Sequence, residues 1–330
     1  MNGAVRRPLG LALLLLALSA ALCLLGSAVG SLGFEPLWNR AGDASAAILW
    51  EIRVPRTLGA WLAGALLGLA GAVAQGLFRN PLADPYLLGS ATGAAFGVAV
   101  LLVLIGVSPV AASGWGARIG LTGAGFLGAV LAVLVTLGLA RGVQQTLRLL
   151  LAGVVVGMLF GAFSALLMFW VPEIMRTMQA FLLGTTGFLG WASVGLLAGV
   201  FALTLLVATG ASRSLDALAL GDTTAASLGV ALAPVRAVLI AVVALATGAA
   251  VAQVGLIAFI GLVAPHLVRA AVKPTHRWLL PLSALAGAVL LLAADVLARW
   301  LLAPQELPVG VLTAVLGGGY LLWLMHRRPL

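Results

Sequence analysis

Apolar stretches long enough to cross a lipid bilayer follow one another along almost the whole chain. They cover about residues 9–29, 57–78, 87–107, 119–140, 149–170, 191–209, 235–252, 256–267, 278–300 and 309–325, and the eighth is unusually short. A helix needs about 20 apolar residues to cross the hydrocarbon core, and it satisfies all of its backbone hydrogen bonds there. The stretches lack the alternating pattern of membrane barrel strands. The sequence therefore predicts an all-α membrane protein with about ten transmembrane helices in one domain, residues 1–330.

The balance of charged and apolar residues excludes a water-soluble protein. Charged residues make up 8% of the chain and hydrophobic residues 63%, whereas a soluble domain has about 25% charged residues. The net charge of +9 comes from basic residues at the ends of the apolar stretches, where such residues set orientation. It gives no sign of nucleic-acid binding. The first stretch is too long and too uniformly apolar for a cleaved signal peptide, so we expect it to be retained.

The distribution of basic residues predicts which side of the membrane each loop occupies. With both termini in the cytoplasm, the inner side holds twelve basic residues: Arg6, Arg7, Arg79, Arg141, Arg148, Arg213, Arg236, Arg269, Lys273, Arg277, Arg327 and Arg328. The outer side holds six: Arg40, Arg53, Arg56, Arg118, Arg176 and Arg299. An excess of basic residues on the cytoplasmic side is the usual pattern in membrane proteins.

A polar segment, residues 213–236, interrupts the apolar second half of the chain. Its leucines and glycines are typical of two short helices joined near Gly221, each with one apolar face. Asp222 is expected to act as the N-cap of the second helix. The segment is either an ordinary solvated loop or a docking surface for an external partner, and composition alone does not separate the two.

Two further patterns concern the helices themselves. The sequence Ala-Val-Ala-Gln occurs at residues 72–75 and again at 250–253, in stretches expected to run in opposite directions, which suggests an inverted repeat. Glycines spaced by four allow helix backbones to approach closely. In the stretch 149–170 these glycines form one stripe, which we expect to leave a smooth face along a path for a bulky solute.

No energy source is visible in the chain. A phosphate-binding loop needs Gly-Lys followed by Ser or Thr, and Lys273 is followed by proline. The ionisable residues expected within the membrane, Asp295 and Arg299, are four residues apart and can pair with each other. No metal or cofactor motif is present. These features favour an importer subunit driven by a separate ATPase, over an ion-coupled secondary transporter or a purely structural scaffold.

Several segments together resemble the permease subunits of bacterial ABC importers for vitamin B12, haem and ferric siderophores. The resemblance extends from about residue 53 to 327 and is carried by IRVPRTLGAWLAGALLGLAGAVAQGLFRNPLADPYLLG, LRLLLAGVVVG, LDALALGDTTAASLGV, GLIAFIGLVAPHLVR and DVLARWLLAPQELPVGVLTAVLGGGYLLWL.

The resemblance implies the type II ABC importer permease fold, with spans 2–5 and 7–10 related as an inverted repeat. It implies a homodimer in the bacterial inner membrane, in contact with lipid, above two copies of an ABC ATPase that carries the ATP and magnesium. A periplasmic substrate-binding protein is expected to dock on the outer side. The chain itself is expected to be a non-enzymatic permease for haem, with cobalamin or a ferric siderophore as alternatives.

The resemblance also implies roles for two groups of residues at the interfaces with these partners. The ATPase coupling residues are expected to be Leu215, Asp216, Leu218, Gly221, Asp222, Ala225, Ala226, Leu228 and Gly229. The arginines expected to receive acidic residues of the binding protein are Arg53, Arg56 and Arg299. Pairing with Asp295 is a competing role for Arg299.

Two more groups are implied along the solute path. The lining is expected to include Gly153, Gly157, Gly161, Val309, Gly310 and Thr313. The inner gate is expected at Gln144, Gln145, Thr146 and Leu147. This sequence has Thr146–Leu147 where some relatives carry two hydroxyl residues, so the chemistry of the gate stays open.

Overall fold

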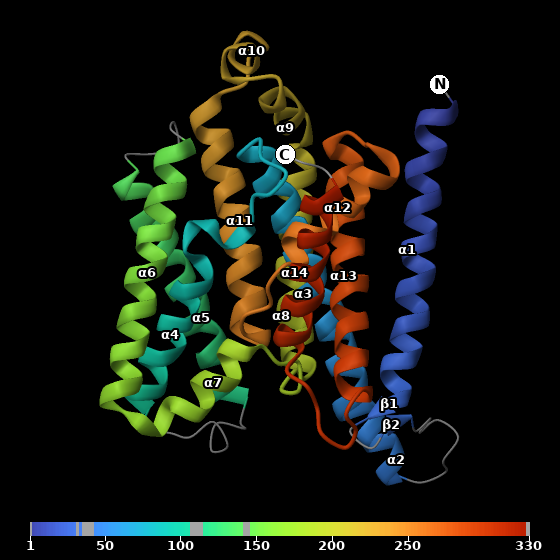
Figure 1. Ribbon diagram of the computed structural model, residues 1–330, viewed down its shortest axis with the longest axis vertical. Helices are drawn as coiled ribbons and strands as arrows, with labels where there is room; N and C mark the ends of the chain where they lie inside the picture. Colours follow the sequence, from blue (N-terminus) through green and yellow to red (C-terminus); the bar gives the residue numbers. More distant parts are fainter. Residues whose placement is uncertain (1, 31–32, 35–42, 106–114, 141–145, 328–330) are drawn as a thin grey trace.

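The structure is a computed structural model that describes residues 2–30, 33–34, 43–105, 115–140 and 146–327. Most of these residues form long helices that stand side by side (Figure 1). The long helices are α1 (Asn2–Ala28), α3 (Val54–Leu77), α4 (Ser90–Ile105), α5 (Trp115–Leu139), α6 (Thr146–Trp170), α8 (Trp191–Gly210), α11 (Leu232–Val254), α12 (Ile260–Val272), α13 (His276–Trp300) and α14 (Val309–Arg327).

Short elements join the long helices at both ends of the molecule. They are β1 (Val29–Gly30), β2 (Gly33–Phe34), α2 (Asp43–Ala47), η2 (Ile48–Arg53), η3 (Pro85–Leu88), η4 (Pro172–Ile174), α7 (Met175–Leu183), α9 (Ser212–Ala219) and α10 (Asp222–Ser227). The segment η4–α7 follows Val171, and Pro172 begins its first turn, where the missing N–H of proline costs no helical hydrogen bond.

The all-α membrane class is confirmed. Seven of the described helices are long and apolar enough to cross a membrane. Three more, α4, α12 and α14, are apolar but shorter. The shortness of α12 agrees with the short eighth stretch of the sequence, while the number of crossings stays a prediction.

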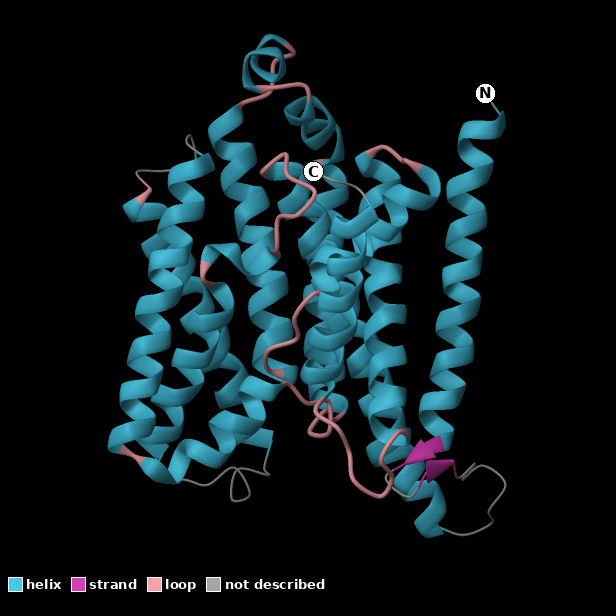
Figure 2. Ribbon diagram, viewed as in Figure 1, coloured by secondary structure: helices cyan, strands magenta, loops and turns pink. Residues whose placement is uncertain are grey.

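The molecule has two distinct ends. The start of α1 and the end of α14 lie at the same end as α9 and α10, which is the upper end in Figure 1. The two-stranded antiparallel pair β1–β2 and helix α2 lie at the opposite end (Figure 2). We call these the α9–α10 end and the β1–β2 end. The start of α1, the end of α14 and the polar segment thus share one end of the described structure, and the side of the membrane on which this end lies stays a prediction.

Helix α3 forms the buried centre, and glycine makes its close contacts possible. A methyl group on Gly71 would lie 1.7 Å from the carbonyl oxygen of Gly261 in α12. Gly64 and Gly287 stand in reciprocal contact, so that a methyl group on either would lie within 2.4 Å of the other's carbonyl oxygen. In the absence of a hydrophobic drive between helices in lipid, such close backbone approach supplies the packing energy.

The two halves of the chain are interleaved. Helix α3 of the first half packs on α12 and α13 of the second, and α11 of the second packs on α4 and α5 of the first. Helices α3 and α11 run in opposite directions along the molecule (Figure 1). This reciprocal pattern is the one that an inverted repeat produces.

The repeated Ala-Val-Ala-Gln sequence ends in two glutamines that join the halves. Gln75 donates to the carbonyl oxygen of Leu262 at 3.2 Å and accepts from Arg269. Gln253 donates to the hydroxyl of Thr122 on α5. Each glutamine thus forms a hydrogen bond with a helix of the opposite half. The two copies of the repeated sequence therefore help to join the halves.

Candidate functional site

The polar segment folds as the sequence predicts, into two short helices. Gly221, with φ of +106°, separates α9 from α10, and Gly229, with φ of +83°, follows α10. Both values lie in a region that glycine adopts without steric cost. Leu215, Leu218 and Ala225 are fully buried and anchor the two helices to the body of the protein. We call α9 and α10 together the α9–α10 platform.

Asp222 holds the platform in a way that the sequence did not predict. The expected N-cap role is wrong: Gly221 occupies the N-cap position, and no side chain caps α10. The Asp222 carboxylate instead accepts from Arg236 on α11 at 2.8 Å and pairs with Arg79, just beyond α3, at 3.3 Å. Bonds to guanidinium groups are charge-assisted and roughly twice as strong as bonds between neutral groups. The carboxylate therefore turns toward the two arginines.

Asp216 ties the other helix of the platform to α13. It accepts from the backbone amide of His276 at 3.0 Å, and its carboxylate lies 2.6 Å from Nδ1 of the same histidine. The platform is thus connected to α3, α11 and α13 by polar side chains.

The outward side of the platform carries leucines among hydroxyl groups. Leu220 and Leu228 are 66% and 63% exposed. Thr223, Thr224 and Ser227 lie exposed between them. An exposed apolar pair within a polar segment is typical of a protein-binding surface. Leu228, Ala226 and Gly229 are among the expected coupling residues. Leu220 and the three hydroxyl residues were not named among them, although they lie in the same segment, and they are exposed as well. The coupling role of all these residues stays a prediction.

At the β1–β2 end, two of the expected docking arginines bind the last turn of α1. Arg53 donates to the carbonyl oxygen of Ala28 at 3.2 Å. Arg299 donates to those of Gly26 and Val29, at 2.8 and 2.7 Å. The last carbonyl groups of a helix have no partners within it, and positive charge is favourable there. These two arginines therefore fasten the end of α1.

The third arginine completes a buried ionic cluster. Asp295 is 0% exposed and pairs with Arg299 at 2.7 Å, which confirms the expected pairing of these two residues. It also pairs with Arg56 at 3.3 Å and accepts from the hydroxyl of Thr186. Arg56 reaches outward to Glu306 at 2.9 Å. We call Arg53, Arg56, Asp295, Arg299 and Glu306 the outer arginine cluster.

The cluster brings the three expected docking arginines together, but their side chains differ in access. Arg53 and Arg299 are 7% and 1% exposed, and both point to the backbone of α1. Arg56 lies at the rim, beside the partly exposed Glu306. Binding-protein docking stays a prediction for all three arginines, of which Arg56, at 12%, is the most exposed.

The expected path residues lie in different surroundings, and their role in a path stays a prediction. A methyl group on Gly153 would lie 1.9 Å from the carbonyl oxygen of Leu87, so this glycine packs α6 against η3. Val309 and Gly310 are buried against neighbouring backbone, and Thr313 donates to the carbonyl oxygen of Gly310. Gly157 and Gly161 have more room. The exposed apolar faces of these helices are formed by Leu151, Val154, Val155, Met158 and Leu159 on α6, and by Val311, Val315 and Leu316 on α14. Those on α6, and Val311, lie within the stretches 151–163 and 309–313 in which the resemblance implies the lining.

The inner gate falls largely outside the described residues. Gln144 and Gln145 lie outside them. Thr146 and Leu147 begin α6, and nothing is described of their side chains. The gate therefore stays a prediction from the resemblance.

Comparison with known proteins gives consistent relatives over nearly the whole length. The model of the FecCD transport family matches residues 11–327. The hemin transport system permease protein HmuU of Yersinia pestis is 41% identical, covering 99% of this chain and 98% of its own. The vitamin B12 import system permease protein BtuC of Salmonella paratyphi A is 40% identical, covering 94% of each chain.

Solved structures show the same architecture. A metal-chelate type ABC transporter in an inward-facing conformation aligns with a TM-score of 0.84 and 28% identity, over 95% of this chain and 98% of that chain. PsaBC from Streptococcus pneumoniae, solved with a Fab, aligns with a TM-score of 0.56 and 17% identity, over 81% and 90%. The second likeness concerns the fold alone.

Proposed function

This chain belongs to the FecCD transport family, and on that premise we propose that it is the permease subunit of an ATP-driven importer. It takes haem, or a similar bulky iron chelate or corrinoid, from a periplasmic binding protein and passes it to the cytoplasm. Haem is the first choice because the relative with 41% identity is named for hemin transport. Cobalamin follows closely, since a relative with 40% identity is named for vitamin B12 import.

The α9–α10 platform is the observation that carries the proposal. It presents Leu220 and Leu228 to the outside of the molecule while Asp216 and Asp222 hold it to the central helices. A surface with exposed leucines suits a protein partner, and the ion pairs give that partner a mechanical connection to the body. The partner is a separate ABC ATPase that binds ATP and magnesium, with one copy beneath each permease. The α9–α10 end is accordingly the cytoplasmic end.

A second copy of the chain completes the path. The exposed apolar residues of α6 and α14 would cover one another, or enclose a passage, in a homodimer. A passage that carries a bulky solute without binding it firmly needs smooth apolar walls more than ligating groups. The binding protein docks at the β1–β2 end, where an acidic side chain can reach Arg56.

The test is to change the outward leucines of the platform. The double variant Leu220→Glu and Leu228→Glu is expected to lose most of its co-purification with the cognate ATPase and most ATP-dependent haem uptake into proteoliposomes. The reason is that two carboxylates would have to be desolvated in the contact. The matched control is Gln305→Glu, an exposed position at the opposite end, which should leave both measurements unchanged.

Normal assembly and uptake by the double variant would contradict the coupling role. Uptake by the chain alone, driven by an ion gradient and abolished by an uncoupler, would point instead to a secondary transporter. Replacing haem by cobalamin in the same assay decides between the two leading solutes.

A further inference from the structure

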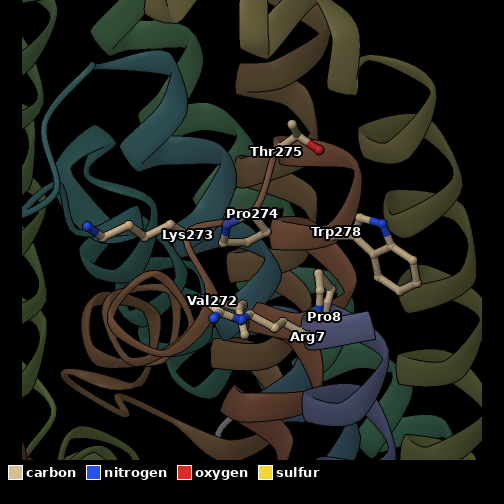
Figure 3. A pocket seen from close by; sticks show the side chains of 7 residues that line it. All are labelled: Arg7, Pro8, Val272, Lys273, Pro274, Thr275 and Trp278. Carbon is tan, nitrogen blue, oxygen red and sulfur yellow. The ribbon is translucent and has the colours of Figure 1, made fainter. Parts of the chain in front are cut away.

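A cavity of about 590 Å³ opens at the α9–α10 end, between the start of α1 and the turn that joins α12 to α13. Sites for small ligands typically enclose about 300–1,000 Å³, so the cavity is large enough for a polar head group. Arg7 and Pro8 of α1 form one side of it (Figure 3). Lys273, Pro274 and Trp278 form the other side.

The cavity is positively charged. Arg7 and Lys273 line it, and no aspartate or glutamate does so within the described residues. Neither basic side chain makes a hydrogen bond or ion pair with any other side chain that the structure describes. The carboxylate that reaches the neighbouring turn, Asp216, is occupied by His276. Among the described residues, therefore, two basic groups line one space with no carboxylate partner.

The turn between α12 and α13 places Lys273 and Thr275 beside the cavity. Lys273 has φ of +43°, a left-handed conformation that ends α12 and directs the chain back toward α13. Thr275 then precedes α13, and its exposed hydroxyl caps no amide, which leaves it available to a ligand in the cavity. In Figure 3 the side chains of Lys273 and Trp278 flank Pro274, and the Arg7 guanidinium lies below them.

The surroundings of the cavity favour a lipid over a soluble anion. On the face of α1 that carries Arg7, Leu11 and Leu14 follow at spacings of four and seven residues, and Leu14 is 55% exposed. These side chains extend the Arg7 face of the helix from the cavity into the apolar part of α1. Tryptophan is enriched at the boundary between head groups and hydrocarbon, and Trp278 stands at that level of the cavity. A free phosphate would use the two cations but not the apolar wall.

We propose that this cavity binds the phosphate head group of an anionic phospholipid, with Arg7 and Lys273 as its counterions and Trp278 beside its glycerol region. The lipid fills the space between α1 and α12–α13 and joins α1 to the body at the end opposite to Arg53 and Arg299. The inference rests on the proposed function solely in assigning this end to the cytoplasmic leaflet.

The experiment is a lipid titration of the purified full-length chain in detergent, followed by native mass spectrometry. The probes are phosphatidylglycerol, zwitterionic phosphatidylcholine and, separately, millimolar inorganic phosphate. We expect phosphatidylglycerol to bind more tightly than phosphatidylcholine. In the double variant Arg7→Gln and Lys273→Gln its affinity should fall about thirtyfold, since each basic residue near a membrane surface contributes about fivefold.

The matched control removes two exposed basic residues elsewhere at the same end, Arg148→Gln and Arg213→Gln, and should keep the wild-type affinity. An equal loss in the control would mean general surface charge and would overturn the proposal. So would equal affinity for the two lipids, or binding of inorganic phosphate that abolishes the lipid preference. The titration uses neither ATPase nor solute, so its failure leaves the transport assignment standing, and a failed transport assay leaves the lipid site standing.

Discussion

The two ends of the molecule use the same arrangement, one aspartate between two arginines, in opposite surroundings. At the α9–α10 end, Asp222 lies between Arg236 and Arg79, and its side chain is 37% exposed. At the β1–β2 end, Asp295 lies between Arg299 and Arg56 and is 0% exposed. The chemical groups and the distances are similar, and the two sites differ chiefly in the exposure of the aspartate and of its second arginine, since Arg79 is 40% and Arg56 12% exposed, while Arg236 and Arg299 are both buried.

This difference determines what each site can do. An ion pair in contact with water contributes about 0–1 kcal/mol and can be exchanged for another partner at little cost. A buried pair is expensive to separate, because one charge would remain without solvent or partner. The platform is therefore suited to adjustment as a partner binds, whereas the outer arginine cluster is suited to holding α1, α3 and α13 in fixed relation.

The sharpest test of this comparison is Asp295→Asn. It leaves Arg299 buried beside Arg56 without a full countercharge, and we expect a loss of about 3–5 kcal/mol in the free energy of unfolding. Thermal unfolding of the purified protein in detergent measures it. The control Glu173→Gln removes an exposed carboxylate at the same end and should leave the midpoint unchanged. The pair Asp295→Leu with Arg299→Met should recover part of the loss. A wild-type unfolding midpoint in Asp295→Asn would show that the buried aspartate contributes no more to stability than the exposed one.

The second test is Asp222→Asn, for which we expect a loss of no more than about 1 kcal/mol. High salt should remove most of this small difference, because salt screens exposed charges, and should leave the effect of Asp295→Asn in place. The measurement is the unfolding midpoint at low and high ionic strength. A large, salt-independent loss in Asp222→Asn would make the platform as rigid as the outer cluster and would break the comparison.

The smallest effect is expected from Glu306→Gln, at the rim of the outer cluster. Arg56 keeps Asp295 as a partner, so the free energy of unfolding should change by less than about 0.5 kcal/mol. Freed from Glu306, Arg56 becomes more available to an acidic partner, and the affinity for the binding protein should rise by about two- to fivefold. Surface-based binding measurements on the reconstituted permease test this, with Gln305→Glu as a neighbouring control expected to show no gain. Weaker binding in Glu306→Gln would mean that Glu306 itself belongs to the docking surface.

The features predicted correctly from the sequence were those encoded within a few residues. The apolar stretches predicted the long helices, and Gly221 predicted the break between α9 and α10. The spacing of four residues between Asp295 and Arg299 predicted their ion pair. Each depends on local periodicity or on the conformational preference of one residue. Such signals are readable without knowledge of the tertiary arrangement.

The features that were missed depend on contacts between distant parts of the chain. Asp222 meets Arg79, 143 positions earlier, and this contact displaced the expected N-cap. Arg53 and Arg299 looked like outward-facing residues because the sequence gives no sign that the end of α1 lies beside them. The glycines of α6 are spaced as the sequence shows, but the sequence does not show that Gly153 faces the backbone of Leu87.

The close contact between α3 and its neighbours has a consequence for conformational change. At Gly71 and Gly64 the backbones of two helices are packed so closely that no methyl group fits between them. Sliding of one helix along the other would break these packing contacts. We therefore expect α3, α12 and α13 to move together as one unit. Alternation between outward and inward access would then involve the loops and outer helices that surround this unit.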